Sequence, residues 1–173
     1  MNSDPHPETR FQRILFCTDF SESADAVFDF VLDAVIRRPG ATLYLLHVIH
    51  EPDAQFWKSY IYEVDNVDDQ ARRAIDAKIA ESYLSRLPAG VSAKVEVRIG
   101  PDAAAILEFA EKTQIDLIIL GRRGHGGVSK ALFGRVAEKI VRKAHCAVLV
   151  VPLDYAQTKP STPSEPARPG TTP

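Results

Sequence analysis

The sequence predicts an α/β domain in which successive βαβ units build one open parallel sheet. Five short apolar stretches alternate along the chain with four segments whose apolar residues recur at helical spacing. Two of the stretches, residues 116–120 and 147–151, are almost purely aliphatic, which is typical of central parallel strands covered on both faces. The length of 173 residues suits a single domain of this class.

The first three expected strands have patterns of their own. Residues 13–18 and 42–49 are short apolar runs, which predict buried strands. Residues 93–99 alternate between apolar and charged side chains. This alternation predicts either a strand with one wetter face or a strand at the edge of the sheet.

The four expected helices lie between these strands. Ser21 or Ser23 is a suitable N-cap for the first, and the Pro39-Gly40 pair is a suitable end. Apolar residues of the second helix form one continuous stripe at helical spacing. The expected helices cover residues 21–38, 67–87, 102–110 and 134–144.

The domain itself is expected to span residues 12–152, with a flexible segment at each end. Residues 1–11 are polar and contain two prolines. Six prolines lie between Pro152 and the last residue, mixed with Ser, Thr and Gly, so the backbone there lacks a regular run of hydrogen-bond donors. We therefore expect residues 153–173 to form a disordered, proline-rich tail.

The connection at residues 50–62 is long for this class of fold and contains Phe56, Trp57 and Tyr60. Three interpretations are open: a lid, an interface with a partner, or an aromatic patch folded back on the core.

Composition and charge exclude several classes of protein. A net charge of −2 gives no reason to expect binding to nucleic acid or to a membrane surface. No apolar run approaches the roughly 18 residues needed to cross a bilayer, and the N-terminus lacks the apolar region of a signal peptide. Cys17 and Cys146 sit in apolar surroundings and are expected to be buried, reduced and not nucleophilic. The sequence therefore predicts a cytoplasmic protein.

Ligands of an open parallel sheet bind beyond the carboxyl ends of the strands, where the strand order reverses. The first expected strand runs into Thr18 and Asp19, and the fourth runs into the glycine-rich segment that starts at Gly121. If these two strands flank the switch point, Asp19 and the glycine-rich segment face the same crevice.

The glycine-rich segment matches neither of two common phosphate motifs. A P-loop requires Lys and then Ser or Thr directly after its final glycine, whereas Gly126 is followed by Gly127 and Val128. The dinucleotide fingerprint requires a third glycine where Ser129 stands. The spacing present instead is Gly121-x2-Gly124-x9-Gly134, with Gly134 at the start of a helix, where free backbone N–H groups favour an anion.

The charge of this segment also predicts an anionic ligand. Residues 121–143 carry seven basic side chains against Glu138. The three near the end of the helix are explained by its dipole. The remaining candidates for an anion contact are Arg122, Arg123 and Arg135. The sequence contains no His, Cys or carboxylate spacing that suggests a metal site.

Over residues 11–151 the sequence resembles the single-domain universal stress proteins. The resemblance lies in five motifs taken in order, at residues 14–23, 45–48, 100–110, 116–124 and 134–151. It implies an adenine nucleotide alpha hydrolase-like fold, namely an open, doubly wound, five-stranded parallel sheet in the order 3-2-1-4-5 with helices on both faces. It also implies a homodimer formed by antiparallel pairing of the last strands through Val148 and Val150.

The resemblance further implies an adenine-nucleotide site. In the nucleotide-binding branch the motif is Gly-x2-Gly-x9-Gly-Ser/Thr, the glycine amides and the hydroxyl hold phosphates, and the aspartate after the first strand contacts adenosine. By position, the residues that match this site are Asp19, Val48, Gly121, Gly124 and Gly134. The further candidate binding residues are Thr18, Arg122, Arg135 and Val136. ATP or AMP is the expected ligand, with or without Mg²⁺.

Arg135 departs from this pattern, because it stands where the family has Ser or Thr. Its longer, permanently charged side chain either grips phosphates directly or fills the pocket in their place. The first alternative predicts a nucleotide-binding sensor or regulator in the stress response. The second predicts a dimeric interaction module that binds no nucleotide. An enzyme, at most a slow ATPase, ranks last because no general base or arginine finger is apparent.

Overall fold

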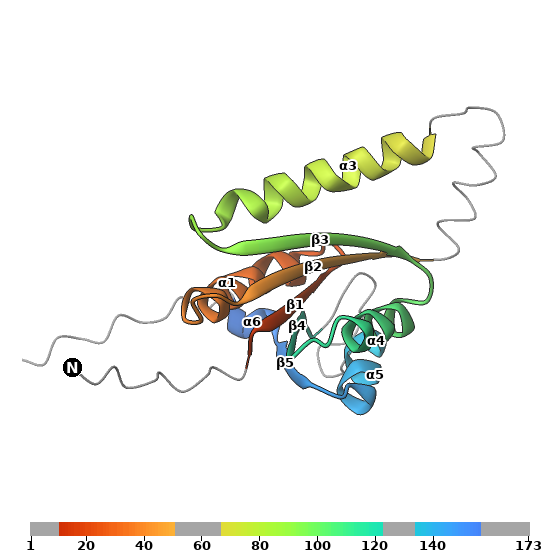
Figure 1. The fold of residues 1–173 in the computed structure, drawn as a ribbon. Coiled ribbons are helices and arrows are strands. Elements are labelled where there is room, and N and C mark those ends of the chain that lie inside the picture. The colour runs from red at the N-terminus through yellow and green to blue at the C-terminus, as the bar shows by residue number, and fades with distance from the viewer. Residues whose placement is uncertain (1–10, 51–66, 123–133, 157–173) are drawn as a thin grey trace, which may run out of the picture.

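The computed structural model describes residues 11–50, 67–122 and 134–156. They form one five-stranded sheet in which every adjacent pair of strands is parallel and the order is β3-β2-β1-β4-β5 (Figure 1). The predicted fold class and strand order are therefore confirmed. The strands are β1 (Arg13–Thr18), β2 (Thr42–Ile49), β3 (Ser92–Ile99), β4 (Leu117–Gly121) and β5 (Ala147–Val151).

Helices cover both faces of this sheet. They are α1 (Glu22–Ile36), α3 (Val67–Ser82), α4 (Asp102–Lys112), α5 (Arg135–Lys143) and α6 (Leu153–Ala156), with a short 3₁₀ helix, η1 (Leu84–Arg86). α1 and α3 pack on one face, and α4 and α5 pack on the other (Figure 1). The chain is thus doubly wound, as parallel βαβ units with right-handed crossovers require.

The first hydrophobic core lies between the sheet and the pair α1 and α3. Alternate residues of each strand point into it, such as Ile14 and Phe16 of β1 and Leu43 and Leu45 of β2, all with no exposed surface. They meet apolar side chains of the two helices, namely Val27, Phe28, Val31 and Ile79.

The second hydrophobic core lies on the opposite face, under α4 and α5. The intervening strand residues supply it, including Leu15 of β1, Leu46 of β2 and Ile118 of β4. Their helical partners are Ala103, Ile106, Phe109, Ala110, Ala137 and Ile140. Because β1 and β4 contribute to both cores, their carboxyl ends are fixed from both sides.

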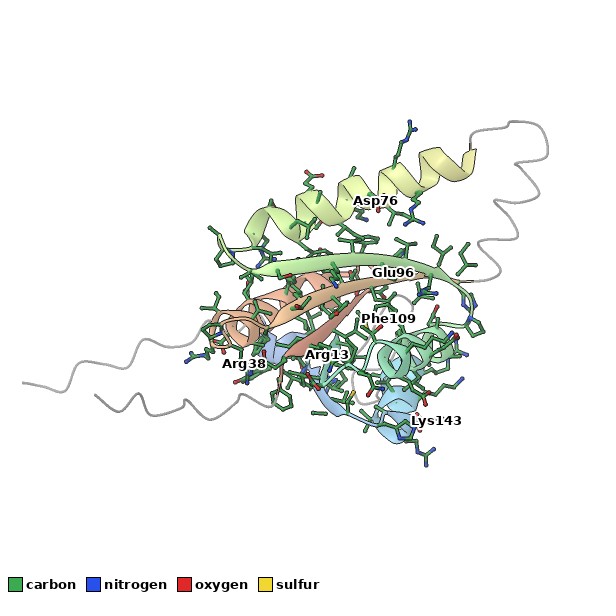
Figure 2. All side chains as sticks on the ribbon, in the orientation of Figure 1. Arg13, Arg38, Asp76, Glu96, Phe109 and Lys143 are labelled. Carbon is green, nitrogen blue, oxygen red and sulfur yellow. The ribbon has the colours of Figure 1, made fainter. Side chains whose placement is uncertain are left out.

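β3 is an edge strand with one polar face, as its alternating sequence predicts. Its Arg98 forms an ion pair with Glu96 at 2.8 Å, and the Arg98 guanidinium lies 5.7 Å from the ring centroid of Phe109. Figure 2 shows Phe109 between the sheet and α4. The charged side chains of β3 therefore cover the aromatic side of the second core while keeping their charges in water.

Three segments differ from the sequence prediction. The expected helix at residues 67–87 ends at Ser82 and continues as η1, because Leu87 precedes Pro88 and is extended, with φ −74° and ψ 132°. β5 lies at the other edge of the sheet, although its aliphatic sequence is typical of a central strand. α6 occupies residues that the composition assigns to the tail, and its Tyr155 ring lies 5.6 Å from that of Phe30 in α1.

Candidate functional site

The switch point of the sheet lies between β1 and β4. β1 pairs with β2 on one side and with β4 on the other, with Phe16 level with Ile119. From β1 the chain passes to α1 on the first face, whereas the helix that follows β4, α5, packs on the second face. The carboxyl ends of these strands therefore border the crevice in which open α/β sheets bind ligands, as the sequence analysis expects.

A tight turn leads out of β1. The N–H of Phe20 donates to Thr18 Oγ1 at 3.0 Å, and the N–H of Ser21 donates to Asp19 Oδ1 at 3.1 Å. Ser21 in turn caps α1, because its Oγ accepts from the N–H of Ala24 at 3.3 Å. These local bonds hold Asp19 at the carboxyl end of β1.

The two ends of the glycine-rich segment meet at the carboxyl end of β4. The N–H of Arg122 donates to the carbonyl of Val151 at 2.9 Å, which extends the pairing of β4 with β5 by one residue. The N–H of Gly134 donates to the carbonyl of Arg122, also at 2.9 Å. Residues 123–133, including the expected phosphate contact Gly124, lie outside the described part of the chain.

α5 begins directly after Gly134, close to the carboxyl end of β4. Its N-cap, Gly134, is extended with φ −63° and ψ 146°, and it provides no side-chain cap for the helix. The first amides of a helix have no intrahelical acceptor, so this end presents N–H groups and the positive end of the helix dipole. Val136 packs against the second core, and Arg135 is exposed.

Arg122 is partly buried and has an unusual environment. Within the described ranges, its Nε is one of two buried side-chain polar atoms without a hydrogen-bond partner, the other being Ser23 Oγ. A buried donor without an acceptor is costly, about 1–3 kcal/mol. A guanidinium N–H in this state, beside an uncapped helix N-terminus, is suited to receive an oxygen atom of an anion.

His47 contacts the turn after β1. Its Nδ1 lies 2.9 Å from the carbonyl of Thr18, and its ring centroid lies 4.6 Å from that of Phe20. Burial lowers the pKa of His47, so the neutral ring donates Nδ1–H to that carbonyl. Val48, the next residue, packs against the second core on the α4 side.

The two cysteines are free thiols that pack against the second core, and both are partly buried rather than fully buried as expected. Burial raises the pKa of Cys17 and of Cys146. Both stay protonated at neutral pH and are poor nucleophiles, as the sequence analysis expects.

The described residues, 11–50, 67–122 and 134–156, lack two further features. They contain no group of three or more His, Cys, Asp or Glu side chains placed to hold a metal ion. No helix among them is long and apolar enough to span a membrane.

The structure brings eight of the nine candidate residues to the carboxyl edge of the sheet or to the start of α5. They are Thr18, Asp19, Val48, Gly121, Arg122, Gly134, Arg135 and Val136. Sequence reasoning missed Tyr83, whose hydroxyl reaches the Thr18 side chain at 2.7 Å. The sequence did contain one sign of this role: Tyr83 carries a hydroxyl within the otherwise apolar stripe of the helix expected at residues 67–87.

A doubly wound parallel sheet whose strand order reverses between β1 and β4 places this chain among the open α/β proteins, whose ligands bind at the carboxyl ends of the strands. The sequence model of the universal stress protein family matches residues 10–152. The chain belongs to the universal stress protein family.

Individual relatives agree with this assignment. Universal stress protein MJ0531 of Methanocaldococcus jannaschii is 30% identical over 150 residues, which cover 83% of this chain and 84% of that protein. The solved structure of hypothetical protein MJ0577, from the same organism, is 26% identical, with a TM-score of 0.68 over 88% of this chain and 100% of the other.

Two more distant structures share the fold and contain ligands. A universal stress protein in complex with cAMP is 21% identical, with a TM-score of 0.52 over 83% of this chain and 98% of its own. A family protein of Arabidopsis thaliana with AMP bound is 19% identical, with a TM-score of 0.50 over 91% of this chain and 99% of its own.

Proposed function

We propose that this protein binds an adenine nucleotide, ATP or AMP, in the β1–β4 crevice and serves as a sensor or regulator in the stress response. The observation that carries this proposal is the orphaned Nε of Arg122 beside the uncapped N-terminus of α5. The AMP and cAMP bound by two family structures support the choice of an adenine nucleotide.

The phosphate end of the ligand belongs at the start of α5. The backbone N–H groups that follow Gly134 have no acceptors in their own helix, and no N-cap side chain provides one. Arg122 and Arg135 add two positive charges, and Gly121 and Gly124 allow close approach of the backbone. Arg135 replaces the family's hydroxyl with a charged fork that is suited to phosphate oxygens, and its exposure leaves it free to turn toward them.

The nucleoside end of the ligand belongs beside Asp19 and Val48. The Asp19 carboxylate supplies acceptors for the hydroxyl or amino groups of adenosine. Val48 supplies an apolar contact at the end of β2, next to the second core. We expect any Mg²⁺ to be bound chiefly by the phosphates, because such ions usually retain several waters and few protein ligands.

Calorimetric titration of the purified protein with ATP, ADP and AMP, each with and without Mg²⁺, tests this function. We expect saturable binding with a Kd below 1 mM for at least one of the three nucleotides. Denaturation of freshly purified protein, followed by chromatography of the supernatant, shows whether nucleotide is retained from the cell. Absence of binding at millimolar nucleotide, with none released on denaturation, contradicts the proposal.

A second candidate function is a nucleotide-free dimeric interaction module in which Arg135 occupies the phosphate site. The departure at Arg135 and the exposed edge of β5, where Leu149 is 41% exposed, favour it. Arg135→Ser separates the two candidates, because it restores the family's hydroxyl. Weaker nucleotide binding in this variant supports a direct phosphate contact, whereas stronger binding supports the module.

A further inference from the structure

The turn after β1 holds Phe20 in a strained backbone conformation. Its φ of 58° lies in the left-handed region, which is energetically unfavourable for a bulky side chain. Such a conformation persists only where the surroundings determine it. The centroid of the Phe20 ring lies 4.6 Å from that of His47 and 4.5 Å from the Lys78 ammonium group of α3.

A directional chain of hydrogen bonds fixes the same turn. Tyr83 has one hydroxyl hydrogen, which it donates to Asp25 in the first turn of α1 at 2.5 Å. The Thr18 hydroxyl, 2.7 Å from the Tyr83 oxygen, must therefore donate to Tyr83. The Thr18 oxygen remains available to accept the N–H of Phe20, so the chain runs from Phe20 through Thr18 and Tyr83 to Asp25.

The packing of Tyr83 holds its side chain in one position. It has no exposed surface, and its ring centroid lies 5.2 Å from that of Phe16 and 4.9 Å from that of Phe28. Burial and the hydrogen bond to Asp25 raise the pKa of the phenol, so the hydroxyl keeps its proton at physiological pH. Because Tyr83 directly follows α3, it ties that helix to the end of β1 and to α1.

We propose that Tyr83 is a positioning residue for the ligand crevice: its hydroxyl holds the Thr18–Phe20 turn, and with it Asp19, in the geometry that receives a nucleoside. The inference rests on the proposed function, and it adds a residue directly after α3 that does not touch the ligand. Since coupling is reciprocal, a nucleoside bound at Asp19 also stabilises the end of α3.

Tyr83→Phe tests this role, because it removes the hydroxyl and keeps the ring. We expect the affinities for adenosine and for AMP to fall by the same factor, about 5- to 20-fold, because the unpaired Thr18 hydroxyl and Asp25 carboxylate no longer hold the turn. The ratio of the two affinities stays constant, since it reports the phosphate end of the site. Calorimetry with each ligand measures both values.

Two control variants exclude a general loss of stability. Tyr44→Phe removes a hydroxyl from the opposite face of the sheet, where the Tyr44 ring packs near Phe109. Ile106→Val removes one methylene from the second core and destabilises it slightly without touching the turn. We expect both variants to keep the wild-type affinities. Equal affinities in Tyr83→Phe and wild type, or an equal loss in Ile106→Val, overturn the proposal.

Amide hydrogen exchange supplies a test that needs no ligand. We expect the Phe20 N–H to exchange at least 10-fold faster in Tyr83→Phe, while amides of α4 change only with global stability. An unchanged Phe20 rate shows that Tyr83 does not hold the turn and overturns the proposal. A wild-type chain that binds no nucleotide overturns the proposed function instead, and with it the ligand-binding half of this inference.

Discussion

Arg122 combines a structural role with the ligand contact proposed above. Its backbone N–H extends the pairing between β4 and β5, whereas its side-chain Nε is buried without an acceptor. The backbone bond does not depend on the type of side chain. The guanidinium can therefore serve the proposed ligand contact without affecting the pairing of β4 with β5. Its unpaired donor lowers the stability of the ligand-free protein.

This conflict predicts opposite effects on stability and binding. Arg122→Met keeps the length of the side chain but removes the unpaired donor and the charge. We expect the free energy of unfolding to rise by about 0.5–1 kcal/mol and the affinity for ATP to fall at least 10-fold. Urea denaturation and calorimetry measure the two changes. The control is Arg73→Met, which removes one charge at an exposed position of α3 and should leave ATP affinity unchanged. A folded Arg122→Met variant with full ATP affinity shows that Arg122 does not contact the phosphates.

His47 predicts a dependence of stability on pH. Burial lowers its pKa in the folded protein, whereas the unfolded chain titrates near the ordinary value of about 6.5. The unfolded state therefore binds the proton first as the pH falls, and the stability present above about pH 6.5 is lost as the pH falls through the folded-state pKa. The charges that face the ring are those of Asp19, Lys78 and Asp102.

The measurement is the free energy of unfolding by urea between about pH 7.5 and pH 5.5. We expect His47→Gln, which keeps a donor for the Thr18 carbonyl, to show a shallower decline than the wild type. His50→Gln is the control, because His50 is an exposed histidine with a side chain 53% accessible. Identical slopes in wild type and His47→Gln contradict the assignment.

At the scale of elements, β5 has a more apolar sequence than is usual for a strand at the edge of a sheet. The N–H of Ala147 donates to Asp116 and the carbonyl of Val151 accepts from Arg122, so these alternate residues bond to the β4 side. The backbone groups of Val148 and Val150 therefore point away from β4. An edge strand with such groups free is a template for pairing with a second chain, which agrees with the predicted homodimer.

Proline substitution tests this pairing at one residue. Val148→Pro removes an N–H that β4 does not use, so we expect the fold to survive while the dimer dissociates to a monomer. Leu149→Pro removes an N–H on the β4 side and should destabilise the domain itself. Sedimentation equilibrium measures the mass, and circular dichroism reports the fold. A folded Val148→Pro variant that remains dimeric places the interface elsewhere.

The elements that were predicted depend on interactions between residues close in the sequence, whereas the element that was missed depends on a contact between distant residues. The positions of β1 and α1 follow from local signals, such as the apolar run after Arg13 and the cap at Ser21. α6 depends on packing against α1 through Tyr155 and Phe30, which are far apart in the sequence. No local pattern contains that contact, so composition alone assigned the segment to the tail.

At the scale of the whole molecule, the same distinction applies to the site. Its location was predictable, because parallel strands bring Asp19 and Gly121 to one edge of the sheet. The role of Tyr83 was not, because its hydroxyl meets Thr18 and Asp25 across 65 and 58 residues of sequence. Helical periodicity predicts that Tyr83 is a core residue, but it does not predict the hydrogen-bond partners of its hydroxyl.

Ligand binding is expected to stabilise the whole domain, because the crevice is built from both cores. At a nucleotide concentration 100 times the Kd, binding adds about 2.7 kcal/mol to the free energy of unfolding. For a domain of this size the Tm should rise by roughly 5–10 °C. Thermal scans over a series of AMP concentrations measure the shift, with guanosine monophosphate as the control. A Tm that is independent of AMP over this range contradicts binding to the folded state.

The hydrogen bond from Gly134 to Arg122 has a consequence for how this protein changes over evolution. It holds Arg122 and Gly134 together, so an insertion between these two residues starts and ends at the same place on the scaffold. Doubling the length of a chain segment whose two ends are held together costs only about 0.6 kcal/mol in entropy. If the proposed function holds, we expect changes of sequence length between these residues to alter ligand specificity while the sheet and α5 keep their structure.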